Sequence, residues 1–109
     1  MRILVTGASG WIGSASVSEL LAAGHEVLGL ARSDSAATTI ASLGAEPVRG
    51  SLEDLEGLRA ITARAEGVVH LGYVHDFSRM EAAAQTDRAA IEVFAEGLAG
   101  TGGPLLIAS

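Results

Sequence analysis

Apolar residues along this chain alternate between short continuous runs and longer stretches in which they recur every three or four positions. Short runs predict buried strands, and the longer spacing predicts amphipathic helices. The pattern predicts strands at residues 3–6, 26–31, 46–49, 67–71 and 104–108. It predicts helices at residues 11–23, 35–43, 52–64 and 78–98. Strands and helices that alternate in this way predict an α/β domain with a parallel sheet.

Right-handed crossovers place such strands most simply in the order 3-2-1-4-5, and Pro47 suits an edge strand because proline donates no ladder hydrogen bond. The glycines at 24 and 44 close the first two helices. Three helices have a predicted inward face. The residues of these faces are Ile12, Val17, Leu20 and Leu21 in the helix at 11–23; Leu55, Leu58, Ile61 and Thr62 in the helix at 52–64; and Met80, Ala84, Ile91, Phe94 and Leu98 in the helix at 78–98.

The amino-acid composition excludes several classes of protein. The 109 residues suggest one domain, at residues 1–109, and nearly half of them are apolar. The net charge of −6 and the scattered arginines predict neither a nucleic-acid partner nor an anionic membrane surface. Absence of cysteine excludes disulfides and thiolate chemistry, and no apolar run is long enough to span a membrane. We therefore expect a soluble, cytoplasmic protein.

A glycine-rich segment connects the first strand to the first helix. Its sequence is Thr6-Gly7-Ala8-Ser9-Gly10-Trp11-Ile12-Gly13. We expect Gly7 to allow a tight turn, Gly10 to let a phosphate approach the backbone, and Gly13 to let the helix pack closely. The amides of the first helical turn would then point at the anion, assisted by the helix dipole.

The spacing Thr-Gly-x-x-Gly-x-x-Gly resembles that of the short-chain dehydrogenase/reductase superfamily, in particular its extended and atypical branches of the epimerase/dehydratase type. The resemblance implies a Rossmann-type, doubly wound sheet that binds NAD(P). A P-loop is excluded because the chain contains no lysine. The alternative is a glycine-rich turn that binds nothing. Cofactor contacts are expected from Gly7, Ser9, Gly10, Trp11, Ile12, Gly13, Arg32, Ser33, Ser51, Leu52, Leu71, Gly72 and Tyr73.

The end of the second strand indicates which dinucleotide is preferred. NAD-binding relatives place an acidic residue there, whereas this chain has Ala31, then Arg32 and Ser33. A guanidinium and a hydroxyl suit the 2′-phosphate of NADP. Asp34 is expected in the loop beyond the strand. NADP is therefore predicted, with NAD second; the alternative is that Arg32 is a solvated loop charge.

Ser51 and Leu52 follow the third strand, where relatives often have Gly-Asp-[Leu/Ile]. The resemblance implies that the family aspartate accepts from the adenine amino group. Here Ser51 could accept only as a neutral hydroxyl, and Leu52 could line the adenine site. Alternatively, Ser51 is the N-cap of the next helix, with Asp54 at its N3 position.

The fourth strand ends in His70-Leu71-Gly72-Tyr73, which is similar to a stretch that passes the cofactor ribose and pyrophosphate in extended relatives. We expect His70 to be structural, because His70, His75 and Asp76 lack the spacing of a metal site. Asp87 lies on the apolar stripe of the long helix, in a region where relatives often carry an asparagine that helps to order the site. We expect an exposed Asp87 that pairs with Arg88 or nearby charges; the alternative is that Asp87 points inward.

The superfamily's catalytic pair, Tyr-x-x-x-Lys, is missing. Tyr73 is the single tyrosine, and Phe77 stands four residues later. We expect no catalytic residue in this chain and interpret it as the incomplete, cofactor-binding part of an oxidoreductase or epimerase/dehydratase, with Ser109 just before the catalytic hydroxyl. That protein would take a small-molecule substrate and could be a homo-oligomer. The alternatives are a non-catalytic NADP(H) sensor and a fragment without function.

Overall fold

The computed structural model describes residues 1–72 and 80–107, with the side chains of residues 80–83 excepted. The strands are β1 (Arg2–Thr6), β2 (Glu26–Ala31), β3 (Glu46–Arg49), β4 (Gly67–His70) and β5 (Leu105–Ile107). The helices are α1 (Trp11–Ala22), α2 (Asp34–Ser42), α3 (Leu55–Thr62) and α4 (Met80–Ala99). The strands form one parallel sheet in the order β3-β2-β1-β4-β5, which confirms the predicted order and its Pro47-bearing edge.

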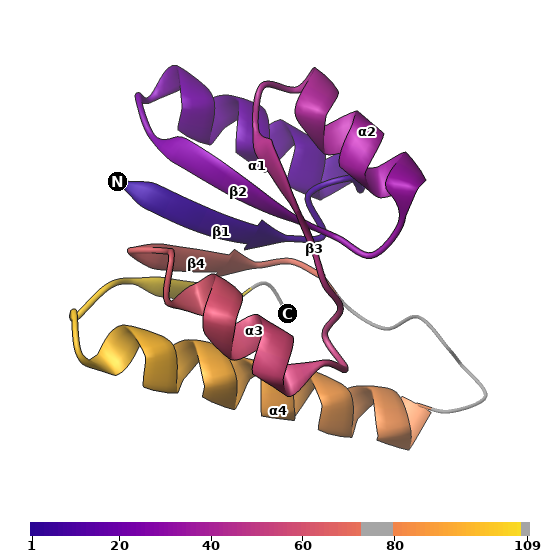
Figure 1. The fold of residues 1–109 in the computed structure, drawn as a ribbon, viewed down its shortest axis with the longest axis vertical. Helices are drawn as coiled ribbons and strands as arrows, with labels where there is room; N and C mark the ends of the chain where they lie inside the picture. The colour runs from indigo at the N-terminus through magenta and orange to yellow at the C-terminus, as the bar shows by residue number, and fades with distance from the viewer. Residues whose placement is uncertain (73–79, 108–109) are drawn as a thin grey trace.

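Helices cover both faces of this sheet, α1 and α2 on one side and α3 and α4 on the other (Figure 1). Successive side chains of a strand point to opposite faces, so each strand contributes to two cores. In β1, Ile3 and Val5 pack with α1 and α2, whereas Leu4 packs with α3 and α4. Burial on both faces explains the continuous apolar runs of the strands.

Two predicted helix faces need correction. In α1, Val17 is buried but Ile12 is 74% exposed, because Ile12 borders the pocket at the start of α1. In α4, Phe94 and Leu98 are buried as predicted, but Ile91 is only half-buried, and Ala90 and Val93 complete the buried face.

Local hydrogen bonds set two helix starts that differ from prediction. Ser33 caps α2, its hydroxyl accepting from the Ala36 amide, so Asp34 is the first residue of this helix rather than part of a loop. Asp54 caps α3, its carboxylate accepting from the Gly57 amide at 3.1 Å. The alternative that Ser51 is this cap was therefore wrong, because an aspartate three residues later provides the acceptor.

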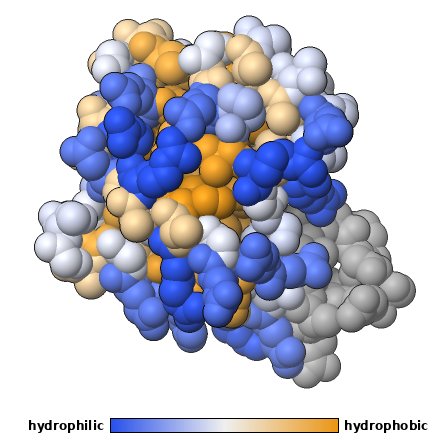
Figure 2. All heavy atoms as spheres, viewed as in Figure 1, coloured by the Kyte–Doolittle hydropathy of each residue, from blue (hydrophilic) through white to orange (hydrophobic). Residues whose placement is uncertain are grey.

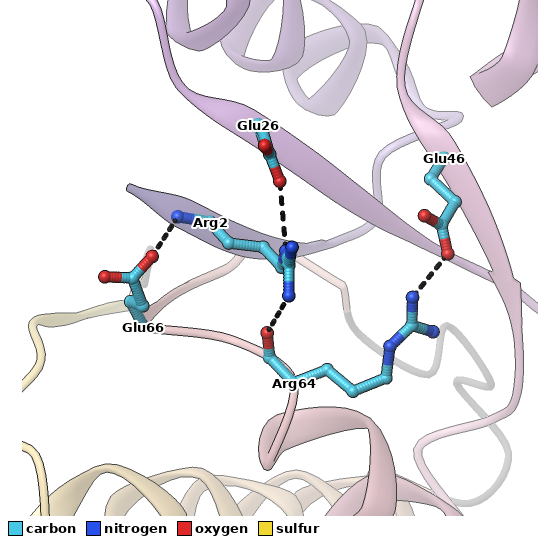
Figure 3. Close-up of polar contacts among 5 residues, drawn as sticks. All are labelled: Arg2, Glu26, Glu46, Arg64 and Glu66. Atoms are coloured by element: carbon cyan, nitrogen blue, oxygen red, sulfur yellow. Dashed lines mark hydrogen bonds and ion pairs between the residues drawn. The ribbon is translucent and has the colours of Figure 1, made fainter.

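Charged side chains connect the amino ends of the strands (Figure 3). The Arg2 guanidinium bonds Glu26 at 3.1 Å and the Arg64 carbonyl at 3.4 Å, and its backbone amide donates to Glu66. Arg64 in turn pairs with Glu46 at 2.6 Å. These pairs are exposed, so each contributes little to stability, on the order of 1 kcal/mol or less.

Figure 2 shows a group of hydrophobic residues at the centre of the face that is turned to the viewer. Strand β3 lies at this face in Figure 1, between the helices of the two layers. The edge strand itself is short, with Pro47 and Val48 half-buried. Among the helices in the described ranges, none is both long and apolar enough to cross a membrane.

Candidate functional site

A pocket of about 680 Å³ lies at the carboxyl ends of β1, β2 and β4, between the starts of α1 and α2 and the segment after β3. Open α/β sheets bind ligands at this edge, where the chain connections diverge to opposite faces. The lining residues are Thr6, Gly7, Ser9, Gly10, Trp11, Ile12, Gly13, Leu30, Arg32, Ser33, Ser35, Ala36, Thr39, Gly50, Ser51, Leu52, Glu53, Leu71 and Gly72. All the predicted contact residues within the described ranges are among them.

Glycine occupies three positions of the β1–α1 loop, and the structural reason differs at each one. Gly7 has φ +69°, a left-handed conformation that favours glycine, and its carbonyl accepts from the Gly10 amide at 3.0 Å in a tight turn. A Cβ on Gly13 would overlap the Gly7 carbonyl, so Gly13 lets α1 start against the loop. A Cβ on Gly10 would meet only the Gly7 oxygen, at 3.3 Å. Gly10 therefore borders space that the protein itself leaves open.

The amino terminus of α1 has no side-chain cap. Its N-cap is Gly10, and its first turn contains no acidic residue. By contrast, Ser33 and Asp54 cap α2 and α3, whose first turns contain Asp34 and Glu56. The free amides and positive dipole end of α1 open onto the pocket, an arrangement that favours an anion.

The end of β2 provides the cationic side of the pocket. Ala31 is buried, and Arg32 and Ser33 are exposed at the lining. Asp34 does not line the pocket; it pairs with Arg49 at the end of β3. Within the described part of the chain, no carboxylate pairs with Arg32. Its guanidinium is therefore available to a ligand, and Glu53 is the acidic group in the lining.

Residues not foreseen from the sequence complete the lining. Ser35 and Thr39 lie one turn apart on α2, and Leu30 contributes from β2. The i, i+4 spacing of Ser35 and Thr39 could have indicated a shared face, but their position at the pocket depends on how α2 docks on the sheet. Beyond β3, Ser51 and Leu52 lie half-buried in the lining.

The end of β4 is joined to β1 by side chains. Thr6 and His70 are register partners in the parallel ladder, and the Thr6 hydroxyl lies 2.7 Å from His70 Nδ1. The same hydroxyl accepts from the amides of Leu71 at 3.0 Å and Gly72 at 2.8 Å. His70 is therefore a buried structural residue, as predicted, but Thr6 was not foreseen as its partner.

Asp87 of α4 points inward. Its carboxylate lies 2.6 Å from His70 Nε2, and its side chain is only 21% exposed. The expectation of an exposed Asp87 was therefore wrong, because a buried ring nitrogen on β4 offers it a partner. Tyr73, His75, Asp76, Phe77 and Ser109, each singled out in the sequence, lie outside the described residues.

Chemically, the pocket is suited to hold a polar, anionic ligand. Backbone amides, hydroxyls and one guanidinium surround it, and apolar side chains border them. Trp11 is 95% exposed beside it. Of the described residues, no group of three or more His, Cys, Asp or Glu side chains is placed to hold a metal ion.

Comparison with known proteins adds three findings. The profile of the NAD dependent epimerase/dehydratase family matches residues 3–95. An uncharacterised protein of Saccharomyces cerevisiae is 49% identical over 108 residues, which are 97% of this chain and 36% of that protein. UDP-glucose 4-epimerase of Thermotoga maritima, solved with UDP-glucose, superposes with a TM-score of 0.81 at 27% identity over 100% of this chain and 38% of that one.

A short-chain dehydrogenase/reductase superfamily protein of Agrobacterium tumefaciens, solved with bound NAD, is 30% identical. The superposition has a TM-score of 0.70 and covers 90% of this chain and 30% of that one. The chain thus spans 30–38% of the length of these three proteins.

Proposed function

The chain belongs to the NAD dependent epimerase/dehydratase family, and we propose that it forms the dinucleotide-binding part of a short-chain dehydrogenase/reductase-type oxidoreductase or epimerase/dehydratase that prefers NADP(H). The observation that carries this proposal is the start of α1. There, uncapped amides and the open space beside Gly10 meet at the pocket. Both features suit a pyrophosphate.

The surroundings of Gly10 indicate whether a dinucleotide would fit at the loop. A side chain at Gly10 would fill the open space beside the loop, although backbone conformation at this residue, φ −78° and ψ 175°, would accept one. Glycine at this position is therefore not needed for the turn. Close approach of a ligand phosphate to the backbone explains it, and Gly7, Ser9 and the first turn of α1 would hold that phosphate.

The preference for NADP(H) follows from Arg32 and Ser33. Arg32 has no carboxylate partner among the described residues, and a guanidinium binds phosphate with two parallel hydrogen bonds. The Ser33 hydroxyl accepts from the Ala36 amide, which leaves its own hydrogen to donate. The residue in this region that could hold ribose hydroxyls, Asp34, is paired with Arg49 outside the pocket.

The adenine would lie between the ends of β2 and β3. Leu30 and Leu52 supply apolar contact there, and the Ser51 hydroxyl offers an uncharged acceptor. We extend the cofactor site along the end of β4, where Leu71 and Gly72 line the pocket, and to Tyr73. Trp11 and Ile12, both exposed at the pocket, would contact the bound dinucleotide with apolar surface.

When bound, the nicotinamide would supply hydride transfer. This chain's own residues would bind and orient the dinucleotide, since it has no lysine and so no Tyr-x-x-x-Lys pair. We place the catalytic pair and the site for a small-molecule substrate in a further part of the protein. That missing lysine favours a second candidate, a non-catalytic NADP(H)-binding sensor.

Calorimetric titration of the purified protein with NADPH, NADH and ADP-ribose tests the proposal. We expect saturable binding of NADPH, weaker binding of NADH, and weaker binding still of ADP-ribose. No binding of any dinucleotide would contradict the proposed function, and equal affinity for NADPH and NADH would contradict the preference. A Tyr-x-x-x-Lys sequence in the remainder of the protein would favour the enzyme over the sensor.

A further inference from the structure

We propose that Asp87 and His70 are positioning residues for dinucleotide binding: through the Thr6 hydroxyl they hold the end of β4 against the glycine loop. The inference rests on the proposed function. Neither Asp87 nor His70 lines the pocket, but Thr6, Leu71 and Gly72 do. A series of hydrogen bonds, from Asp87 to His70 and from His70 to Thr6, thus connects α4 to the wall of the site.

The direction of each hydrogen bond follows from counting donors at Thr6. Its oxygen accepts from the amides of Leu71 and Gly72, which uses both lone pairs. The hydroxyl hydrogen must then be donated to His70 Nδ1, 2.7 Å away. The Nδ1 atom is therefore an acceptor and carries no proton, and His70 is neutral.

A neutral imidazole with an unprotonated Nδ1 has its hydrogen on Nε2. That hydrogen is donated to the Asp87 carboxylate at 2.6 Å. The ring is 1% exposed and lies against Phe94, with 5.3 Å between ring centroids. Asp87 thus selects the tautomer that accepts from Thr6, and packing prevents the ring from turning away.

Thr6 joins two walls of the pocket at a point of close approach. A Cβ on Gly7 would come within 2.9 Å of the Gly72 amide nitrogen, so the glycine loop and the β4 end touch through their backbones. The Thr6 hydroxyl holds the amides of Leu71 and Gly72 at this point. If the hydroxyl turned away, both amides would lose their acceptor, and the wall beside the phosphate-binding loop would be free to shift.

Substitution of Asp87 in the intact protein tests the inference. We expect Asp87→Ala to weaken NADPH binding roughly tenfold, because part of the binding free energy must then restore the position of the β4 end. Asp87→Asn keeps an oxygen acceptor for Nε2 and should retain affinity within about threefold. Glu92→Ala, at an exposed position of the same helix, is the matched control and should bind like wild type.

Three further measurements distinguish a positioning role of Asp87 from a general loss of stability in the Asp87→Ala protein. Arg32 and Ser33 lie at the other side of the pocket, so we expect 2′-AMP, the part of NADP with the 2′-phosphate, to bind Asp87→Ala as it binds wild type. Amide hydrogen exchange at Leu71 and Gly72 should accelerate in Asp87→Ala but not in Asp87→Asn. Nitrogen-15 spectra of wild-type His70 should show a proton on Nε2 and none on Nδ1.

Thr6 gives a second route if Asp87→Ala fails to fold. Thr6→Val preserves shape but removes the hydroxyl, and we expect the same loss of NADPH affinity; Thr6→Ser should retain it. Unchanged NADPH affinity in Asp87→Ala or Thr6→Val, or a proton on Nδ1, would overturn the inference. Failure of wild type to bind NADPH would instead contradict the proposed function.

Discussion

Gly13 and Gly7 touch so closely that a Cβ on Gly13 would overlap the carbonyl oxygen of Gly7. The third glycine of the loop is thus required by the fold of the protein itself. A Cβ on Gly10, midway between them, would make one tight contact, with the Gly7 oxygen at 3.3 Å, and would otherwise face open space. The two positions should therefore respond differently to substitution, and that difference separates folding from binding.

We predict that Gly10→Val abolishes dinucleotide binding with little loss of helix content. Its side chain would occupy the space that the phosphate needs, while its backbone conformation suits any residue. Calorimetry and far-ultraviolet circular dichroism measure the two effects. Gly100→Val, where a Cβ would meet nothing within 4 Å, is the control. Tight binding by Gly10→Val would mean that the loop is merely a turn.

We predict that Arg32→Ala removes the preference for NADPH over NADH. Loss of an arginine–phosphate contact should weaken NADPH binding by about 1.5–3 kcal/mol, roughly ten- to hundredfold, with NADH affinity almost unchanged. Calorimetric titration with both cofactors measures this. Arg2→Ala, at the opposite end of the strands (Figure 3), removes the same charge and controls for net electrostatics. Equal losses in the two variants would argue against a specific phosphate contact.

We predict that a polypeptide of residues 1–109 has no dehydrogenase turnover, because it lacks lysine and therefore the Tyr–Lys pair. Oxidation of NADPH with carbonyl substrates, followed by absorbance, should stay at the level of buffer alone. Specific turnover that disappears in Tyr73→Phe would overturn this prediction.

We predict that the same polypeptide associates at rising concentration. Among the described residues, β5 pairs with β4 alone, and its Leu106 and Ile107 are 63% and 43% exposed. An apolar edge with unpaired backbone groups favours association. Sedimentation at several concentrations tests this, and Leu106→Lys should reduce it. A stable monomer that unfolds cooperatively would show that these residues close their own core.

We predict that Asp54→Ala lowers the free energy of unfolding by about 1 kcal/mol, the usual cost of losing an N-cap. The Gly57 amide would lose its acceptor at the start of α3. Chemical denaturation measures the change, and Glu96→Ala, exposed on α4, provides a control. An unchanged unfolding midpoint would mean that water replaces the cap at no cost.

Local patterns in the sequence determined the order of elements and the position of the pocket. Apolar runs and three-to-four spacings are properties of neighbouring residues, so they located the strands and helices that the structure describes in residues 1–72 and 80–107. Strand order followed from handed crossovers. The glycine spacing indicated the loop, and Pro47 indicated the edge strand, because each depends on one residue's backbone chemistry.

Only the tertiary structure decided which polar groups meet. Thr6, His70 and Asp87 come from β1, β4 and α4, and no local pattern aligns them. Periodicity also placed Ile12 inward, although Ile12 lines the pocket at the start of α1 and is exposed. A side chain's partner depends on how whole elements dock, and docking is set by the sum of many packing contacts rather than by sequence spacing.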